Sequence, residues 1–352
     1  MQTNLRNFHG EMIYVGIDCH LKSWKVTLMS SEMELCSFTQ PPESRKLASY
    51  LKAHYPGAEF QCVYEAGFSG FNAQRELNAE GINCIVIHPA DVPTTDREKR
   101  QKSDVIDSRK LVRGLKNGDL KPLYVPGLQQ QQDRSLLRTY DKLVRNTTRV
   151  KNRIKFFLMS FGLAIPSEFQ DKTWTKDFMS WLKTCRPGGY ADTSFQAYLQ
   201  EYDHLLGQTV LLKKKIKELS GHPVYATDAK LLQSIPGIGL LTAMVLLTEI
   251  GDVNRFKGLN ELAAYLGLIP NCHDSGETKR VGSNTKRGNV YLKYILIEAS
   301  WMCLRYDPSM LLAYKSAVRK MDSNKAIIKV ARKLLNRIRF VLKNKRPYQI
   351  NQ

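Results

Sequence analysis

Four carboxylates in the first third of a strongly basic chain have the types and the spacing to bind metal ions together. Asp18 and Glu65 each end an apolar run, and Asp104 and Asp107 form a D-x-x-D pair. An unpaired charge at the end of a buried strand is costly, and a divalent cation shared by such carboxylates offsets that cost. Because the chain carries a formal net charge of +20, this arrangement predicts magnesium held against nucleic-acid phosphates.

A pair of magnesium ions bridged by carboxylates can activate an attacking oxygen and stabilise a leaving one in phosphoryl transfer. Such a site needs three or four acids that converge from separate elements. Taken singly, each acid is better explained as a surface or helix-capping residue, since Asp often starts helices. The set of four, in this order, favours a metal site that holds two ions.

Strand and helix signals alternate in the segment that carries these acids. The β-forming runs lie at 12–18, 24–29, 60–65 and 83–87, and helical spacing occurs at 44–54 and 72–80. This alternation of strand and helix signals predicts an α/β domain with a mixed sheet. Asp104 and Asp107 open an amphipathic stretch, and positions i and i+3 of a helix share a face, so both can point at one site.

Size and charge restrict the class of protein. The 352 residues have an ordinary apolar fraction and predict two or three folded domains. The basic excess implies a polyanionic partner, and nucleic acid is favoured over an anionic membrane because no apolar run approaches the roughly 18 residues of a spanning helix. The start of the chain lacks the apolar segment of a secretion signal, and the seven cysteines form no C-x-x-C pair, so we expect a reduced, cytoplasmic protein without zinc.

Two heptad seams follow, the first over 128–165 and the second over 198–219. Residues 166–196 between them are rich in aromatics with Pro and Gly, and predict a connector. The seams predict long helices in a coiled coil. They could pack on each other within one chain or also join two copies, and the sequence leaves both possibilities open.

The last third begins with a glycine turn, Ile235-Pro236-Gly237-Ile238-Gly239, before an apolar run. It resembles the hairpin of helix-hairpin-helix modules, in which Gly237 and Gly239 would let backbone N–H groups reach a phosphate. A tight turn between two core helices explains it equally well.

Farther on, residues 313–346 predict one basic helix whose only acid is Asp322, and charge of one sign favours an anionic partner.

Ser275 precedes a glycine in a predicted turn and is followed by basic residues. A serine hydroxyl is a weak nucleophile unless a base, a metal or cationic surroundings activate it. From the residues alone, a turn serine in a phosphate-binding loop is the better explanation, and His273 and Asp274 are possible helpers. The cations that would hold a phosphate here are Lys279, Arg280, Lys286 and Arg287.

Seven short motifs occur in one order along residues 12–305 and together resemble the DEDD transposases of the insertion-sequence-110 family, which includes the Piv-type DNA invertases. Each motif alone is weak, but their joint order and spacing are specific. They are Gly16-Ile17-Asp18, Tyr64-Glu65-Ala66-Gly67, Lys102-Ser103-Asp104-Val105-Ile106-Asp107, Ser234-Ile235-Pro236-Gly237-Ile238-Gly239, Ala264-Tyr265-Leu266-Gly267-Leu268-Ile269-Pro270, Ser275-Gly276 and Lys286-Arg287-Gly288-Asn289.

The resemblance implies three parts. These are a RuvC-like, ribonuclease-H-like catalytic domain over 1–127, a coiled-coil and linker region over 128–227, and a mostly helical transposase domain over 228–352 that carries the serine motif and the basic tail. It also implies that Asp18, Glu65, Asp104 and Asp107 bind magnesium and that Ser275 attacks a phosphate of double-stranded DNA to form a phosphoserine link. Many relatives use a structured RNA from the element's flanks and assemble as dimers and tetramers.

Other functions stay open. Ser283 competes with Ser275 for the role of nucleophile. The chain could be an invertase rather than a transposase. A RuvC-like nuclease would cut through metal-activated water and leave Ser275 structural, and a non-catalytic nucleic-acid-binding protein would keep the fold only.

Overall fold

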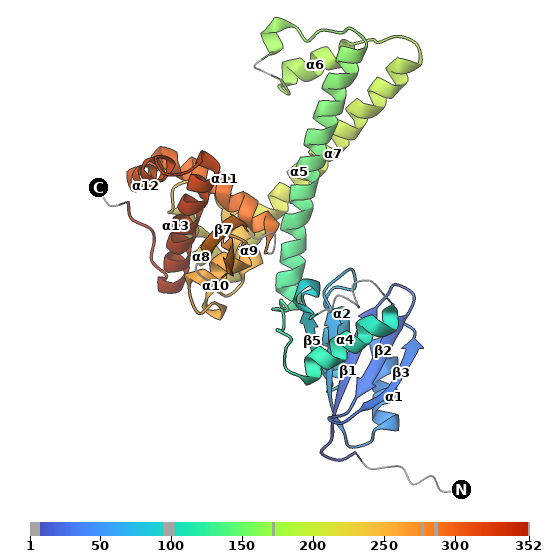
Figure 1. The fold of residues 1–352 in the computed structure, drawn as a ribbon. Helices are drawn as coiled ribbons and strands as arrows, with labels where there is room; N and C mark the ends of the chain where they lie inside the picture. Colours follow the sequence, from blue (N-terminus) through green and yellow to red (C-terminus); the bar gives the residue numbers. More distant parts are fainter. Residues whose placement is uncertain (1–7, 94–102, 171–172, 276–277, 285–287, 351–352) are drawn as a thin grey trace. The chain divides into compact units, whose positions relative to one another are not determined.

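The computed structural model describes residues 8–93, 103–170, 173–275, 278–284 and 288–350, and for 270–284 it describes the backbone. The chain divides into two compact units, Met1–Val125 and Pro126–Gln352 (Figure 1). The first is α/β and the second is mostly helical. The further division of the second unit at residue 227 stays a prediction.

The first unit is built on a five-stranded sheet with the order β3-β2-β1-β4-β5. Its strands are β1 (Met12–Cys19), β2 (Trp24–Met29), β3 (Glu34–Gln40), β4 (Glu59–Glu65) and β5 (Asn83–Ile87). β1, β2 and β3 are antiparallel neighbours, whereas β1 pairs with β4, and β4 with β5, in parallel. The predicted mixed sheet is confirmed. β3 was not predicted because it is a half-buried strand at the sheet edge, with no run of buried apolar residues.

Helices cover both faces of this sheet. α1 (Ser44–His54) and α2 (Asn72–Ala79) place Leu51 and Leu77 in one buried cluster with Ile17. α4 (Asp104–Lys116) places Leu111 in a second cluster with Val63. Side chains alternate across a strand, so the residues on either side of Ile17 in β1 face α4. A short helix, η1 (Pro89–Asp91), follows β5.

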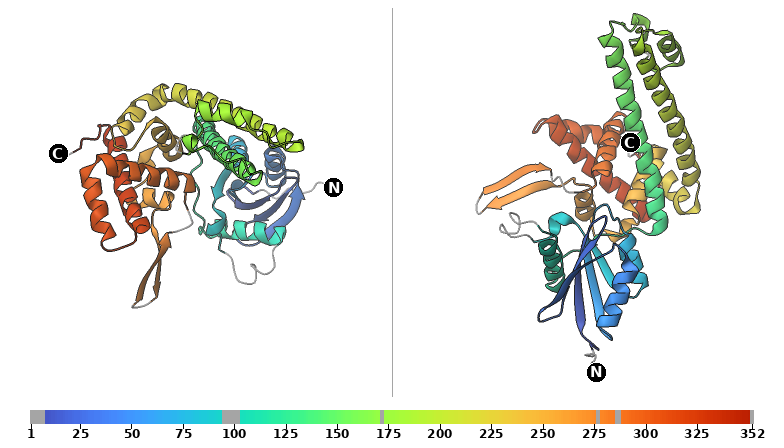
Figure 2. Two further views of the ribbon diagram at one scale, coloured as in Figure 1. Left: turned by 90° about the horizontal axis from the view of Figure 1, so that it is seen from above. Right: turned by 90° about the vertical axis from the view of Figure 1, so that its right-hand side faces the viewer.

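Two long helices dominate the start of the second unit (Figure 2). They are α5 (Leu128–Ser160) and α7 (Tyr190–Ser220), and between them lie η2 (Ser167–Phe169) and α6 (Lys176–Thr184). The helices run antiparallel, with Phe157 against Phe195 and Arg153 paired with Glu201 at 2.8 Å. The two heptad seams therefore meet within the chain, and an additional dimer contact stays a prediction.

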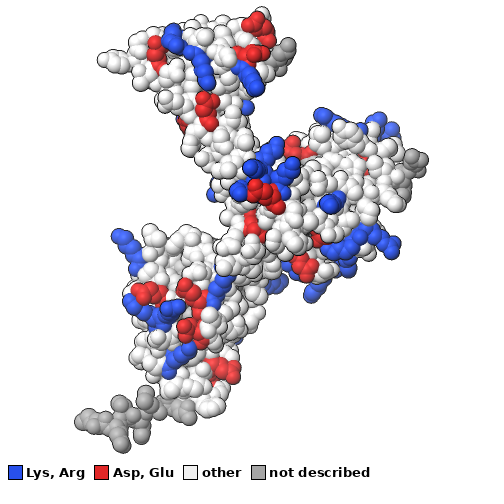
Figure 3. Space-filling model, turned by 180° about the vertical axis from the view of Figure 1, so that it is seen from behind, with Lys and Arg blue, Asp and Glu red and all other residues white. Residues whose placement is uncertain are grey.

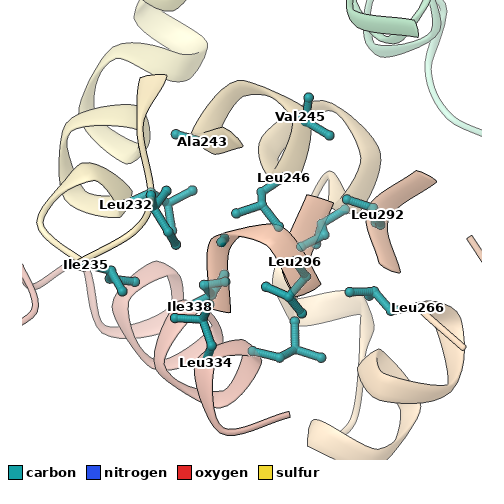
Figure 4. Close-up of a cluster of buried hydrophobic side chains, with 14 of the residues drawn as sticks. Leu232, Ile235, Ala243, Val245, Leu246, Leu266, Leu292, Leu296, Leu334 and Ile338 are labelled. Atoms are coloured by element: carbon teal, nitrogen blue, oxygen red, sulfur yellow. The ribbon is translucent and has the colours of Figure 1, made fainter. Parts of the chain in front are cut away.

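The rest of the second unit packs around one apolar core (Figure 4). Its elements are α8 (Pro223–Gln233), α9 (Leu240–Ile250), η3 (Val253–Arg255), α10 (Leu259–Tyr265), β6 (Pro270–Ser275), β7 (Thr278–Asn284), α11 (Val290–Tyr306), α12 (Pro308–Val318) and α13 (Ser323–Asn344). Leu246, Leu296 and Leu334 meet in this core, and Leu137 of α5 and Ile216 of α7 join it. One end of each long helix thus packs in the same core as the helices that follow.

The prediction of one continuous helix over 313–346 was wrong. The tail forms α12 and α13, which are separated at residues 319–322. Asp322 has non-helical backbone angles (φ −55°, ψ 148°) and directly precedes the new helix, although its side chain forms no cap hydrogen bond. The break lets α13 fold back so that Val330, Leu334 and Ile338 face the core.

Lys and Arg side chains lie at the surface of both units in the face drawn in Figure 3. Among the described residues, no helix is both long enough and apolar enough to cross a membrane.

Candidate active site

The two central strands bring two of the predicted acids to one edge of the sheet. β1 and β4 are parallel, and Ile17 stands opposite Tyr64. Asp18 and Glu65 are the next residues of these strands, and both are half-buried. Because parallel strands end at the same edge, both carboxylates belong to the carboxyl edge of the sheet, where open α/β sheets bind their ligands.

α4 brings the other two acids to the sheet, and its approach requires a glycine. A Cβ on Gly16 would lie 2.3 Å from the carbonyl oxygen of Ser108 and 2.7 Å from the backbone nitrogen of Val112. The buried hydroxyls of Thr27 and Ser108 are hydrogen-bonded at 2.8 Å. α4 is therefore fixed against β1 and β2 at the position before Ile17.

The first turn of α4 is also fixed at its N-terminus. The Ser103 hydroxyl accepts a hydrogen bond from the Ile106 N–H at 3.3 Å and caps the helix. Asp104 and Asp107 both lie in this turn.

Asp18 and Asp104 meet across a histidine. The Nε2 atom of His20 lies 3.1 Å from Oδ2 of Asp18 and 3.3 Å from Oδ1 of Asp104. One potential ligand atom from each of these residues lies within 4.8 Å of the others. Asp104 keeps 64% of its side-chain surface exposed and Asp18 keeps 21%, so the group is open to a ligand.

His20 was missed from the sequence. The signal was available, because residues two apart at a strand end point to the same side, and His20 follows Asp18 at that spacing. A single histidine beside a cysteine is not by itself typical of a metal site, so a pattern built on carboxylates did not include it.

The other two predicted acids lie outside this three-residue group within the described part of the chain. Oδ1 of Asp107 forms an ion pair with Nζ of Lys110 at 2.7 Å, and the Lys110 side chain is only 10% exposed. Glu65 lies at the same sheet edge as Asp18. The structure thus joins Asp18 with Asp104 and places Asp107 against a lysine.

Burial raises the pKa of Asp18 above its ordinary value. His20 acts in the opposite direction, while the charges of Asp107 and Asp104 raise the pKa further. A bound cation would relieve this repulsion between carboxylates. Carboxylate oxygens suit magnesium and manganese, and an imidazole ligand also suits zinc. These residues therefore fit a divalent metal ion.

Ser275 ends β6 of the hairpin that projects from the helices of the second unit (Figure 2). In the backbone register Ser275 pairs with Thr278, next to the turn, and Lys279 and Arg280 lie on the facing strand. Ser283 lies on β7 toward the base, where Pro270 pairs with Asn284. The predicted cations Lys286 and Arg287 lie outside the described residues.

A close backbone contact joins the two ends of this hairpin. Gly288 has φ +116°, and a Cβ there would lie 2.5 Å from the nitrogen of Gly267. The N–H of Asn289 donates to the carbonyl of Tyr265 at 2.7 Å. The Gly267 and Gly288 motifs that suggested the family thus form the base of the serine hairpin.

The base is tied to a buried charge network. The Asn289 side chain caps α11 through Leu292 N–H and donates to Oε2 of Glu249 at 2.8 Å. Glu249 is fully buried and accepts two hydrogen bonds from Arg138 of α5, at 2.6 and 2.8 Å. The pKa of Arg138 is raised, chiefly by this interaction and against the effect of burial. Arg134 lies 3.5 Å from the same carboxylate.

Glu249 was also missed as a site residue. It is the only charged residue of α9, and a single acid in an otherwise apolar helix is the signal that could have found it, since buried charges are paired.

The predicted glycines of the turn before α9 have different roles. Gly237 has φ +86°, and a Cβ there would lie 2.5 Å from the carbonyl oxygen of Ala299, so packing against α11 accounts for it. Gly239 precedes α9 without a side-chain cap, and a Cβ there would meet nothing within 4 Å. Phosphate contact at Gly239 stays a prediction.

Comparison with known proteins agrees with this arrangement. Residues 15–162 match a DEDD transposase family model described as a transposase, and residues 229–315 match the transposase IS116/IS110/IS902 family. The protein y4rJ of Sinorhizobium fredii is 31% identical over 300 residues, which cover 78% of this chain and 74% of that protein. The chain belongs to the IS110 family of DEDD transposases. DNA binding and an enzymatic role in moving DNA follow from membership of this family.

Two further proteins similar to this IS110-family transposase are also named as transposases. The protein y4qE of Sinorhizobium fredii is 30% identical over 260 residues, which span 71% of this chain and 61% of that protein. The transposase for insertion sequence element IS1111A of Coxiella burnetii is 25% identical over 280 residues, or 77% of this chain and 75% of that protein. The two family models cover the acidic edge and the serine hairpin.

Proposed function

We propose that this transposase cuts and rejoins DNA through a covalent bond to Ser275, assisted by divalent metal ions at the acidic edge of the sheet. The convergence of Asp18, His20 and Asp104 within 4.8 Å is the observation that carries the metal-assisted step. Support for the serine comes from the match of residues 229–315, which include Ser275, to the transposase family. A mixed sheet whose neighbouring central strands end in carboxylates supports the RuvC-like, ribonuclease-H-like interpretation of the first unit.

Asp18, Glu65, Asp104 and Asp107 would hold two magnesium ions, and His20 offers a further ligand. When bound, such ions neutralise charge that develops on phosphate oxygens during displacement. Asp107 can join the set only if its ion pair with Lys110 opens or is shared. Lys110 would then be a counter-charge that keeps the carboxylate in place before metal binds.

The covalent step conserves bonds. The Ser275 hydroxyl loses its proton to a base and attacks a DNA phosphorus, the bond from phosphorus to one deoxyribose oxygen breaks, and that oxygen leaves as a protonated hydroxyl. In the second step a deoxyribose hydroxyl attacks the phosphoserine and releases the serine. The number of phosphate ester bonds is unchanged, so rejoining needs no external energy source. Lys279, Arg280, Lys286 and Arg287 would hold the phosphate.

The resemblance to the family also implies an RNA guide from the element's flanks and a dimer or tetramer. The net charge of +20 suits two nucleic acids as well as one. Large apolar side chains remain exposed on α5 and α7 in the described structure, including Phe156 (69%), Met159 (68%) and Val210 (61%). Such exposed residues support packing of these helices on a second copy.

The test uses labelled double-stranded DNA that contains the element's ends, with magnesium, resolved on a denaturing gel. Wild type should give a labelled band that migrates with the protein. Ser275→Ala should lose the band, whereas the matched variant Ser283→Ala should keep it. Retention of the band in Ser275→Ala and its loss in Ser283→Ala would move the nucleophile to Ser283.

A RuvC-like nuclease is the second candidate, since the acidic group alone could activate water. Free cleaved DNA in every lane, with no protein-linked band, would establish that function and remove the serine chemistry. Asp104→Asn should abolish cleavage in either case and leave salt-sensitive DNA binding intact. An invertase of the Piv type would form the same covalent link and differ in its products, by inverting a segment rather than moving it.

A further inference from the structure

A groove between α12 and α13 gathers positive charge. Its volume is about 790 Å³, and its floor includes the buried side chains of Met310 and Val330. Among the described residues that line it, none is acidic. Five cations do line it: Lys320, Lys329, Arg332, Lys333 and Arg337.

The arginines and the lysines of the groove differ in their partners. Arg337 pairs with Asp307 and donates to the Ser309 hydroxyl at 2.6 Å, and Arg332 donates to Oδ1 of Asn260 at 3.0 Å. The two arginines are therefore held by the protein. Lys320, Lys329 and Lys333 are exposed, and within the described part of the chain none of them forms an ion pair. Like charges at this density repel each other until an anion joins them.

The cations form a row. Lys329, Lys333 and Arg337 recur at every fourth position of α13 and share one face of the helix, with about 6 Å of helical rise between neighbours. Lys320 follows the end of α12 on the opposite wall. A row of cations along a narrow groove tracks a nucleic-acid backbone, and the apolar floor suits the deoxyribose.

We propose that this groove binds the sugar–phosphate backbone of duplex DNA along one strand. The inference rests on the DNA binding of the family and does not depend on the chemistry proposed for Ser275. Arg332 also lies 3.5 Å from the carbonyl oxygen of Leu268, two residues before β6. A strand in the groove would therefore run beside the base of the serine hairpin. Because phosphate contacts carry no sequence information, the groove positions DNA without selecting its sequence.

The test compares two double variants of the full chain that remove the same charge from the same helix. Lys329→Gln with Lys333→Gln changes the groove. Lys325→Gln with Lys343→Gln changes two exposed lysines of α13 that do not line it. Binding of an uncut fluorescent duplex is measured by anisotropy in EDTA over a range of salt concentrations, for two unrelated sequences. No cleavage is needed, so the result is independent of the serine and metal chemistry.

The groove variant should lower the slope of log affinity against log salt by about 2, equally for both sequences. The control variant should change that slope by much less. Equal losses in the two variants would show a general charge effect and overturn the groove. No loss with DNA but a loss with single-stranded or structured RNA would assign the groove to RNA instead. Thermal unfolding that matches wild type excludes misfolding, and Lys320→Gln tests the opposite wall.

Discussion

At the scale of single residues, the acidic site depends on the absence of a side chain. Gly16 is the residue over which α4 crosses β1, and the backbone of Ser108 and Val112 occupies the space of its Cβ. The carboxylates of Asp18 and Asp104 are brought together by this crossing. The proposed metal site therefore depends on a residue that offers no ligand atom.

Gly16→Ala should destabilise the first unit by about 1–3 kcal/mol, because a methyl group must displace backbone rather than a flexible side chain. Urea unfolding measures the change. Gly67→Ala is the matched control, since a Cβ there meets nothing within 4 Å. Equal stability of the two variants would contradict the close approach of α4.

At the scale of elements, the network around Glu249 joins α5, α9 and the start of α11. Its carboxylate faces Arg138, Arg134 and Asn289. A buried ion pair adds little net stability, but the loss of one partner leaves the others uncompensated. The network therefore fixes geometry more than it contributes free energy.

Glu249→Gln should lower the free energy of unfolding by about 3 kcal/mol, since it removes the charge that Arg134 and Arg138 face. The exposed Glu298→Gln on α11 should be nearly neutral. In a double-mutant cycle, Glu249→Gln and Arg138→Gln should cost less together than the sum of their separate costs. Additive costs would show that the two side chains act independently.

A second cluster joins α12, α13 and the end of the chain at Asp307. Burial raises the pKa of this carboxyl, but hydrogen bonds from Ser309, Tyr348 and the Met310 N–H, together with Arg337, outweigh burial and hold it below its ordinary value. The folded state thus favours the charged form more than the unfolded state does. The stability that Asp307 supplies is present above the ordinary aspartate pKa of about 3.9 and is lost as the pH falls through the lower folded value.

Asp307→Asn should therefore weaken the dependence of stability on pH in the acid range. Unfolding free energies of wild type and variant, measured between neutral and strongly acid pH, should converge as the pH falls. A constant difference over that range would contradict the lowered pKa.

At the scale of the whole molecule, the acids and the serine belong to different compact units. The first unit has its own core, and Trp24, which is 5% exposed, is its only tryptophan. Residues 1–125 should fold alone with a cooperative transition in Trp24 fluorescence. A gradual change without a transition would show that this unit needs the rest of the chain.

Magnesium should raise the melting temperature of this fragment, because Asp18, His20 and Asp104 all lie within it. A ligand at a hundred times its dissociation constant stabilises by about 2.7 kcal/mol. Asp104→Asn should remove the shift, and the exposed Glu32→Gln should keep it. The same melting temperature with and without magnesium or manganese would reject the metal site.

The sequence predicted what depends on local pattern. Strand-ending Asp18 and helix-opening Asp104 could be read from apolar runs and spacing. The role of Gly16 could not be read, because α4 lies far away in the sequence. His20 and Glu249 left a local signal that was missed, and their partners Asp104 and Arg138 lie on distant elements. The helix break before α13 was not predicted either. It is required only because α13 packs back on the core, and that core is formed by elements distant in sequence. The parts that escaped are those set by packing between elements.

A small rotation of the hairpin at its base causes a large displacement of Ser275 near its tip. From Pro270 to Ser275 the strand rises about 17 Å, while its two ends meet at Gly267 and Gly288. A tilt of about 10° at that base would move the backbone of Ser275 by about 3 Å, and a misplacement of about 1 Å can cost a hundredfold in rate. The position of Ser275 is therefore sensitive to small rotations at the hairpin base, which Asn289 holds through Tyr265 and Glu249.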